Sequence, residues 1–275
     1  MDAMLDSTVS YSIFDPTGNL TALVESPVDP ACRGELAAAL MRLHPLLEQV
    51  GFVRFPEDGA LRAELDMAGG EFCGNATMSA AALCLLRRGV CDAGERRVRL
   101  RVSGTERGIE VRLSRERGDS FAAAVSMPPA LAVTETEAVC GALRDTLPLV
   151  EMEGISHAIV APRSPLSALR DDGARAAELI RSMCAALGAP CLGLLFWDGG
   201  TERSRLEPLV YVPGSGTLVW EKSCASGCSA LGMYLAAQRG GRVRLELVQR
   251  GGTLRVESDA RSGETWLYGR TKRIG

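Results

Sequence analysis

The sequence has very few lysines and histidines. Among 275 residues, Lys222 and Lys272 are the only lysines, and His44 and His157 are the only histidines. A pyridoxal phosphate enzyme would therefore have little choice of Schiff-base lysine. The chain has no Cys-x-x-Cys pair for a structural zinc site, and no GxGxxG or GxxxxGK[ST] pattern for a nucleotide. We expect chemistry performed by side chains alone, with no cofactor and no metal.

Long apolar runs are also missing. The most apolar stretch, SAAALCLL, ends at Arg87-Arg88, short of the roughly 18 to 20 residues of a membrane span. The N-terminus, MDAMLDSTVSYS, carries acidic residues where a signal peptide would carry basic ones. Nine cysteines are an odd count without the close spacing of a secreted disulfide scaffold. A net charge of -3 gives no reason to expect nucleic acid. We expect a cytoplasmic protein that binds neither membrane nor nucleic acid.

What the chain does contain is a repeat around two cysteines. CGNATMSAAALCLLRRG begins at Cys73, and CASGCSALGMYLAAQRG begins at Cys224. In both stretches an arginine follows the cysteine after 15 positions and a glycine after 16. A small or polar first turn, an alanine- and leucine-rich body, a basic last turn and a glycine stop predict one helix in each copy.

The segments around these two helices match as well. Residues 97–113 and 242–258 alternate like β-hairpins, while 52–67 and 204–220 predict paired strands leading to each cysteine. Further helices are predicted near 31–44 and 173–188, each after a strand. We therefore predict an α/β (α+β) protein of two pseudo-symmetric domains, each a twisted, mostly antiparallel sheet wrapped around a central helix. Their expected ranges are 1–128 and 129–275, with a last strand, about 262–275, that could pack back on the first domain.

A thiol at the start of a helix is suited to acid/base chemistry. Unpaired N–H groups and the positive end of the helix dipole can bind a carboxylate, and they lower a thiol pKa from about 8.5 to roughly 3.5–7.5. If one thiolate removed an α-proton and the other thiol delivered a proton to the opposite face, the protein would be a racemase or epimerase without cofactor. Small residues that would admit a ligand to the helix amides are Gly74, Asn75, Ala225 and Ser226.

Other interpretations of the cysteines remain open at this point. Buried cysteine is common and usually structural, although two cysteines at equivalent places of a repeat favour a function. A binding protein with the same fold would not need both thiols. A dithiol redox protein would form a reversible Cys73–Cys224 disulfide, which we expect only as oxidative inactivation. We interpret Cys228, one helical turn after Cys224, as a packing residue.

Four stretches carry a resemblance to a known family: YSIFDPTGNLT, LLEQVGF, GGEFCGNATMS and PLVYVPGSGTLVWEKSCASG. The sequence resembles the diaminopimelate epimerase superfamily and, within it, most closely the histidine racemases of staphylopine-type opine metallophore biosynthesis. This resemblance implies an amino-acid substrate, no cofactor, and Cys73 and Cys224 as the catalytic base and acid. It also implies interconversion of L- and D-histidine for metallophore biosynthesis.

The resemblance assigns substrate-binding roles in the first half of the chain to Asn19, Glu48 and Gln49. Asn19 occupies the position of the family's substrate-binding asparagine in the loop Pro-Thr-Gly-Asn; otherwise it is a turn residue. Glu48 would accept a hydrogen bond from the substrate imidazole, or else be an exposed charge at a helix end.

In the second half the resemblance assigns His157 and Glu221 to the site, with a structural histidine and a surface charge as the alternatives. His157 is placed as the counterpart of Asn19. The chain reads Val212-Pro213-Gly214 where diaminopimelate epimerases carry a Glu-Arg clamp, and Ala225 where glycine is usual. Without that arginine, a distal carboxylate would lose its bidentate partner, which favours histidine. Diaminopimelate epimerase, or another racemase of the same fold, is the alternative function. A homodimer is compatible with the sequence.

Overall fold

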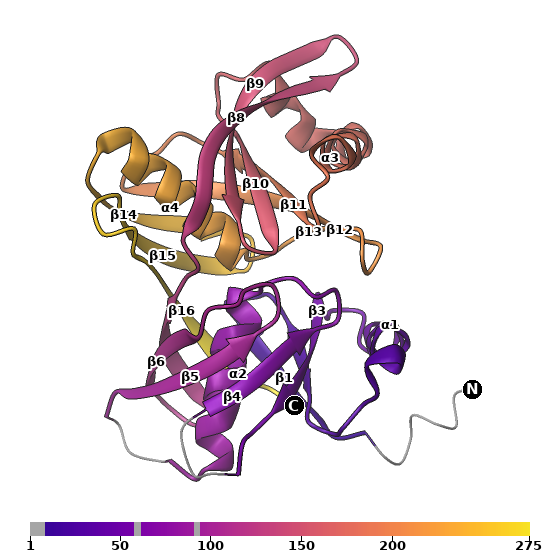
Figure 1. Ribbon diagram of the computed structural model, residues 1–275, viewed down its shortest axis with the longest axis vertical. Helices are drawn as coiled ribbons and strands as arrows, with labels where there is room; N and C mark the ends of the chain where they lie inside the picture. The colour runs from indigo at the N-terminus through magenta and orange to yellow at the C-terminus, as the bar shows by residue number, and fades with distance from the viewer. Residues whose placement is uncertain (1–8, 58–61, 91–93) are drawn as a thin grey trace. The chain divides into compact units, whose positions relative to one another are not determined.

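The computed structural model describes residues 9–57, 62–90 and 94–275. The segment 1–8, in which no signal peptide is expected, lies outside the described residues. The chain divides into two compact units. In Figure 1 the first is indigo to magenta, apart from its yellow C-terminal residues, and the second is pink to yellow. Unit 1 contains the chain up to Val125 together with Gly269–Gly275, and unit 2 is Ser126–Tyr268. The end of the chain therefore belongs to the same unit as its beginning.

Unit 1 is a ring of strands. Its elements are β1 (Tyr11–Pro16), β2 (Thr21–Val24), a 3-10 turn (Pro30–Cys32), α1 (Arg33–Leu43), β3 (Gln49–Arg54), β4 (Arg62–Met67), α2 (Gly74–Arg87), β5 (Arg96–Val102), β6 (Ile109–Arg115) and β7 (Ser120–Ser126). The strands β1 to β7 pair in sequence order, and β16 (Thr265–Arg273) follows β7. Because β16 also pairs with β1, with Phe14 opposite Arg273, the ring closes.

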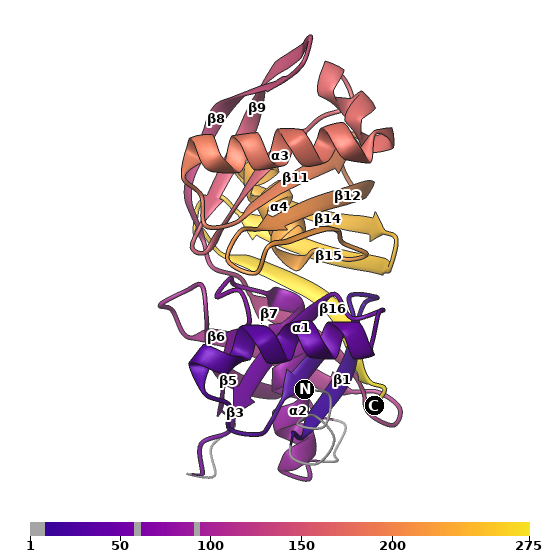
Figure 2. The ribbon, with the colours of Figure 1, turned by 90° about the vertical axis from the view of Figure 1, so that its right-hand side faces the viewer.

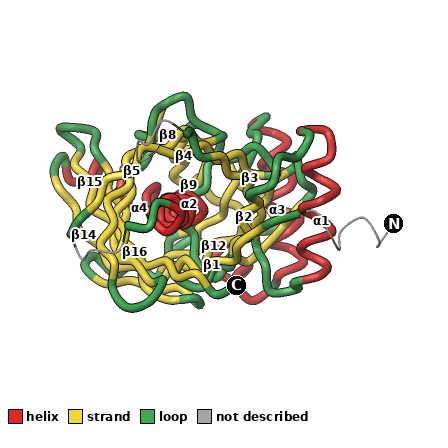
Figure 3. The backbone as a smooth tube through the Cα atoms, turned by 90° about the horizontal axis from the view of Figure 1, so that it is seen from below, coloured by secondary structure: helices red, strands yellow, loops and turns green. Residues whose placement is uncertain are grey.

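The helix α2 fills this ring. Every residue from Gly74 to Leu85 is buried, and the helix contacts strands β1 to β6. Figure 3 looks along this helix, with strands on all sides of it. Alanine at 80, 81 and 82 keeps the helix thin, which lets the strands approach closely while apolar side chains alternate inward from them. No helix in the described part of the chain is long and apolar enough to cross a membrane.

Unit 2 repeats this plan around a second buried helix. Its elements are β8 (Ala130–Cys140), β9 (Leu143–Met152), β10 (Ile155–Val160), a 3-10 helix (Pro165–Asp171), α3 (Gly173–Leu187), β11 (Leu192–Trp197), β12 (Arg203–Val212), β13 (Thr217–Trp220), α4 (Ala225–Arg239), β14 (Arg242–Gln249) and β15 (Gly252–Asp259). The strand order is β15-β14-β12-β11-β10-β9-β8, and β13 pairs with β12. The strand β16 starts beside β15, with Tyr268 opposite Arg255.

The two units share both element order and strand direction. In unit 1 the pairs β2–β3 and β4–β5 are parallel, and in unit 2 the matching pairs β10–β11 and β12–β14 are parallel. The predicted two-domain α+β fold with a central helix in each copy is confirmed. The strand β9 matches β1, because each pairs antiparallel with the strand that follows it. No strand described before β1 corresponds to β8. Sequence analysis did not predict β8, although ALAVTETEAVC alternates in the manner of a strand.

A second helix packs on the sheet of each unit and forms a separate core there. Leu36 and Leu40 of α1 pack in one hydrophobic cluster with Phe52. Leu179 and Met183 of α3 pack in another cluster that draws on β8 to β12. Figure 2 shows α1 and α3 as the outer helices of their respective units. Each of these helices supports the sheet of its own unit.

Candidate active site

Cys73 is the N-cap residue of α2. Its backbone is extended, with φ -129° and ψ 108°, and its Sγ accepts a hydrogen bond from the Ala76 N–H at 3.3 Å. Its carbonyl oxygen accepts from the Thr77 N–H at 2.9 Å and from the Thr77 hydroxyl at 2.7 Å. The side chain is 7% exposed. The thiol thus takes the place that a serine or aspartate oxygen usually has at the start of a helix, and one helix amide points at the sulfur.

Gln49, the first residue of β3, lies directly against this thiol. The Cys73 Sγ donates to Gln49 Oε1 at 2.6 Å. Its neighbour Glu48 accepts a hydrogen bond from Asn19 Nδ2 at 3.0 Å. Two successive residues at the start of one strand therefore contact the thiol and the loop that was expected to bind the substrate.

Asn19 is fully buried, and its Oδ1 has no hydrogen-bond partner within the described ranges. The turn before it is made by Thr17 and Gly18, whose φ angles are 58° and 88°. Asn19 is therefore not needed for a left-handed turn, the structural alternative considered for it. A buried carbonyl oxygen without a partner costs about 1–3 kcal/mol, which a bound donor would recover.

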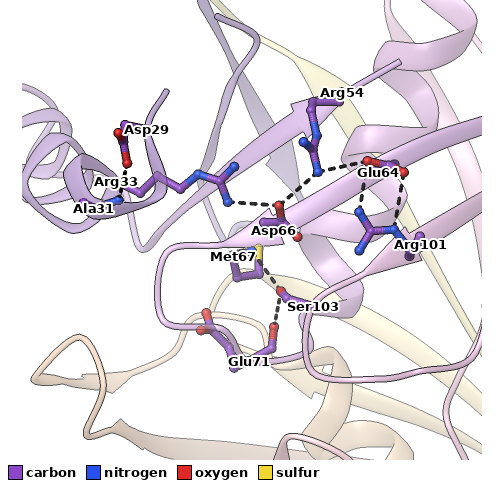
Figure 4. Close-up of polar contacts among 10 residues, drawn as sticks. All are labelled: Asp29, Ala31, Arg33, Arg54, Glu64, Asp66, Met67, Glu71, Arg101 and Ser103. Carbon is purple, nitrogen blue, oxygen red and sulfur yellow. Dashed lines mark hydrogen bonds and ion pairs between the residues drawn. The ribbon is translucent and has the colours of Figure 1, made fainter. Parts of the chain in front are cut away.

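The loop that leads into Cys73 is held by Ser103, as Figure 4 shows. The Ser103 hydroxyl accepts from the Met67 N–H at 2.8 Å and donates to the Glu71 carbonyl oxygen at 2.9 Å. Gly104 follows with φ 75°, and a Cβ there would lie 2.2 Å from the Phe72 nitrogen. Only glycine allows this approach. The side chain just after β5 thus fixes the backbone two residues before the thiol.

Figure 4 also shows a row of ion pairs along β4. Arg33 lies 2.9 Å from Asp66, while Arg54 and Arg101 each lie 3.0 Å from Glu64. The hydrogen bond from Arg101 lowers the pKa of Glu64. Both arginines on Glu64 are mostly exposed, so these pairs contribute little to stability and bring no group to Cys73.

Cys224 repeats the geometry of Cys73 at the start of α4. It is the N-cap residue, with φ -114° and ψ 108°, and its Sγ accepts from the Gly227 N–H at 3.4 Å. The Ser226 hydroxyl lies 3.6 Å from the same sulfur. The side chain is 3% exposed.

His157 contacts this second thiol through Ser226. Its Nε2 lies 3.0 Å from the Ser226 Oγ, and the ring is fully buried. Burial lowers the pKa of His157 to about 3, so the imidazole is neutral. The ring fits because residue 193 is glycine, where a Cβ would lie 2.2 Å from Nδ1. Nδ1 has no partner in the described part of the chain, so a proton on Nε2, donated to Ser226, satisfies more groups than one on Nδ1.

The thiol pKa of Cys224 differs from the expectation. Burial raises the pKa of Cys224 well above its usual value, and the negative charge and hydrogen bond of Glu221 raise it further. The contacts from Ser226 and the Gly227 N–H act in the opposite direction. The prediction that the helix start lowers this pKa is wrong for Cys224, because desolvation of the thiolate outweighs one amide and one hydroxyl.

The position of His157 also corrects an expectation. Each of the two strands follows a glycine in the left-handed region, Gly18 with φ 88° in unit 1 and Gly154 with φ 77° in unit 2. Thr21 stands three residues after the first glycine, and His157 three residues after the second. The counterpart of His157 is therefore Thr21, not Asn19.

Sequence analysis missed Gln249, the last residue of β14. Its Oε1 accepts from the Cys224 N–H at 2.8 Å, and its Nε2 donates to the Cys228 Sγ at 3.0 Å. The inward positions of β14 are Val243, Leu245 and Leu247, and Gln249 continues them. A polar residue at an inward position of an apolar strand was the available signal.

Two buried thiols, each at a helix start beside a polar neighbour, are groups that can donate and accept protons. In the described residues, no group of three or more His, Cys, Asp or Glu side chains could hold a metal ion.

A family model described as "Histidine racemase CntK N-terminal domain" matches residues 8–267. The chain belongs to this family. As a member of it, the chain is an amino-acid racemase, an isomerase.

Relatives of this racemase are similar over most of their length. A histidine racemase of Staphylococcus aureus is 28% identical over 84% of this chain and 81% of its own. A histidine racemase of Fusobacterium nucleatum is 29% identical over 80% of this chain and 78% of its own.

Solved structures share the fold of this racemase at low sequence identity. A predicted epimerase from Pseudomonas aeruginosa has a TM-score of 0.67 at 16% identity, over 98% of both chains. A hydroxyproline epimerase from Agrobacterium vitis has a TM-score of 0.70 at 12% identity, over 97% of this chain and 89% of that one.

Proposed function

We propose that this racemase interconverts L- and D-histidine without a cofactor, using Cys73 and Cys224 as its two acid/base groups. The observation that carries the proposal is the shared geometry of two buried thiols. Each is an N-cap residue in an extended conformation, and each sulfur accepts an amide hydrogen bond from the residue three positions later. Structural cysteines have no need of the same cap geometry twice. The histidine racemases among the relatives support the choice of substrate.

The protonation states in this proposal differ between the two thiols. Burial and Glu221 raise the pKa of Cys224, so Cys224 starts a turnover as a thiol and serves as the acid. Cys73 then starts as the thiolate, stabilised by the Ala76 N–H. Gln49 is a suitable partner for Cys73 if Cys73 alternates between thiol and thiolate. Its amide offers Oε1 to a thiol and, after a half-turn, Nε2–H to a thiolate.

In the proposed reaction, the Cys73 thiolate removes the α-proton from one enantiomer of histidine. The Cys224 thiol then delivers its proton to the opposite face of the same carbon. Negative charge that develops on the substrate carboxylate is stabilised by the positive ends of α2 and α4. The turnover leaves Cys73 as thiol and Cys224 as thiolate, so the reverse reaction starts from the exchanged states.

We propose that Glu48 and Asn19 recognise polar groups of the substrate. Glu48 already accepts one hydrogen bond from Asn19, and a carboxylate can accept several. An imidazole N–H is a suitable donor to Glu48, and the Asn19 Oδ1 can accept from the substrate's ammonium group.

The test is proton NMR of the reduced protein with L-histidine in D2O, together with chiral analysis of the product. Loss of the α-proton signal with appearance of D-histidine is the expected result. A parallel sample with diaminopimelate or proline tests the substrate separately. Exchange with one of these but not with histidine would keep the two-thiol reaction and reject histidine, whereas no exchange with any of them would reject the proposed reaction.

We further propose that the D-histidine enters opine metallophore biosynthesis and that the reaction takes place in the cytoplasm, where thiols stay reduced. An enzyme that condenses an amino group of D-histidine would have to consume this product. If metallophore production continued unchanged in a deletion strain, that role would be rejected.

A further inference from the structure

We propose that Gln249 is a positioning residue that holds Cys224 in its reactive geometry through hydrogen bonds to two successive turns of α4. This inference rests on the proposed role of Cys224. The amide of Gln249 makes two hydrogen bonds, both to the start of this one helix. Its Oε1 accepts from the N–H of the cap residue at 2.8 Å, and its Nε2 donates to the Cys228 Sγ, one turn further, at 3.0 Å.

The two bonds define the orientation of the amide. The Cys224 N–H can only donate, so the atom facing it is the oxygen, and the nitrogen then faces Cys228. The Gln249 side chain is 6% exposed, so water cannot readily replace either bond. Without Gln249, the N–H of the cap residue would be buried and without an acceptor, which is unfavourable. Relaxation of the cap backbone is the way to avoid that cost.

Relaxation of the cap would displace the thiol. The Cys224 Sγ accepts from the Gly227 N–H at 3.4 Å, and Ser226 lies 3.6 Å away, so both contacts are already long. Small backbone shifts would lose them. A displacement of about 1 Å at a reacting group can cost 10²-fold in rate. Gln249 therefore acts on the thiol through the backbone, without touching the substrate.

Unit 1 has a related contact from a different side chain. Ser103 lies just after β5, the strand that corresponds to β14, and its hydroxyl donates to the Glu71 carbonyl oxygen two residues before Cys73. In both units a polar side chain at the end of the strand that follows the helix reaches back towards the start of that helix. Ser103 contacts the loop before the cap residue, whereas Gln249 contacts the cap residue itself and the next turn of the helix.

The experiment compares Gln249→Met, which keeps the volume and removes both hydrogen bonds, with Gln238→Met on the exposed end of α4. Racemisation kinetics, thermal unfolding and amide hydrogen exchange at Cys224 and Gly227 are measured for each. For Gln249→Met we expect kcat to fall about 10- to 100-fold with KM within about threefold, and local loss of amide protection at both residues. Gln238→Met should match the wild type in all three measurements.

An unchanged kcat despite lost protection would overturn the proposal, and so would unchanged protection. A loss of kcat that only follows a lower Tm would also reject it in favour of a purely structural role. Cys228→Ala tests the role of Gln249 independently, because it removes the hydrogen bond between Gln249 Nε2 and the Cys228 Sγ. We expect a kcat about two- to fivefold lower in the wild-type background and no further loss in the Gln249→Met background. If the losses in kcat of the two single variants added up in the double variant, the proposal that both hydrogen bonds act together would be contradicted. The amide exchange does not depend on turnover, so a failure of the racemase proposal would be seen separately in the wild-type D2O assay.

Discussion

The starts of α2 and α4 have the same backbone and different surroundings. Cys73 and Cys224 share an extended N-cap conformation and an amide contact to sulfur. Around Cys73 the nearest polar partner is the amide of Gln49, which can serve either protonation state. Around Cys224 there is a neutral imidazole behind Ser226, together with the carboxylate of Glu221. The two equivalent helix starts thus have distinct surroundings, which suits the proposed reaction with one acid and one base.

Replacing either thiol should have the largest effect. Cys73→Ala and Cys224→Ala are each expected to lower racemisation about 10²- to 10⁴-fold, because each removes one acid/base group. α-Proton exchange in D2O, followed separately for L- and D-histidine, would show which thiol serves which face. Cys184→Ala, a buried cysteine of α3 far from either helix start in sequence, is the control and should keep its activity. Full activity in either of the first two variants would end the two-thiol mechanism.

The buried imidazole should make unit 2 sensitive to acid. The pKa of His157 is about 3 in the folded protein against an ordinary value of 6.5, so only the unfolded chain binds the proton between these limits. The free energy of unfolding is fully retained above pH 6.5. As the pH falls below that value, it should decrease by about 1.4 kcal/mol per unit.

His157→Gln keeps a donor towards Ser226 and removes the titrating group. The one-proton contribution to the pH dependence of urea unfolding should disappear in this variant. If the free energy of unfolding changed equally with pH in the wild type and the variant, His157 would not be the source of this pH dependence.

Filling the space beside His157 should destabilise the protein by an intermediate amount. In Gly193→Ala the new Cβ would lie 2.2 Å from the ring, so the imidazole must move, at an expected cost of about 1–3 kcal/mol. Gly34→Ala, where no atom lies within 4 Å of the added Cβ, should instead stabilise α1 by up to about 1 kcal/mol. Thermal unfolding of the two variants should therefore shift in opposite directions. Equal shifts would mean that the imidazole is not confined.

The smallest expected effect concerns the charge of Glu221. Because that charge raises the pKa of Cys224, Glu221→Gln should lower the thiol pKa and increase the thiolate fraction at a given pH. Alkylation of Cys224 by iodoacetamide at pH 8, followed by peptide mass spectrometry, should become several-fold faster. Glu246→Gln, at an exposed position of β14, is the control. A slower reaction in Glu221→Gln would contradict this assignment.

Patterns within short stretches of the sequence were sufficient to predict the two-domain fold and the central helix of each domain. The glycine stop after α4 and the alternation of the two hairpins predicted the repeat, and Cys73 and Cys224 followed as the residues at the helix starts. The long strand β8 was missed because it has no partner in the repeat, although its own alternation was visible. Such signals work where the relevant residues are neighbours along the chain.

Contacts between distant residues could not be predicted in the same way. His157 and Ser226 are 69 positions apart, and their hydrogen bond depends on the register of β10 with β11 and on a glycine at 193. The reach of Gln249 back to Cys224 depends on where β14 ends. The pKa of Cys224 is raised chiefly by burial. The position of a thiol at a helix start does not show how deeply it is buried.

The closure of unit 1 by β16 bears on how the chain is made. Seven strands of the ring precede residue 127, whereas the residues of β16 that belong to this unit begin at Gly269. At the usual 5–20 residues per second, a ribosome needs about 7–29 s to synthesise the intervening segment. During that time β1 and β7 expose their edges, and an exposed strand edge can pair with another chain. The nascent unit 1 is therefore exposed to such pairing until Gly269–Gly275 has been translated.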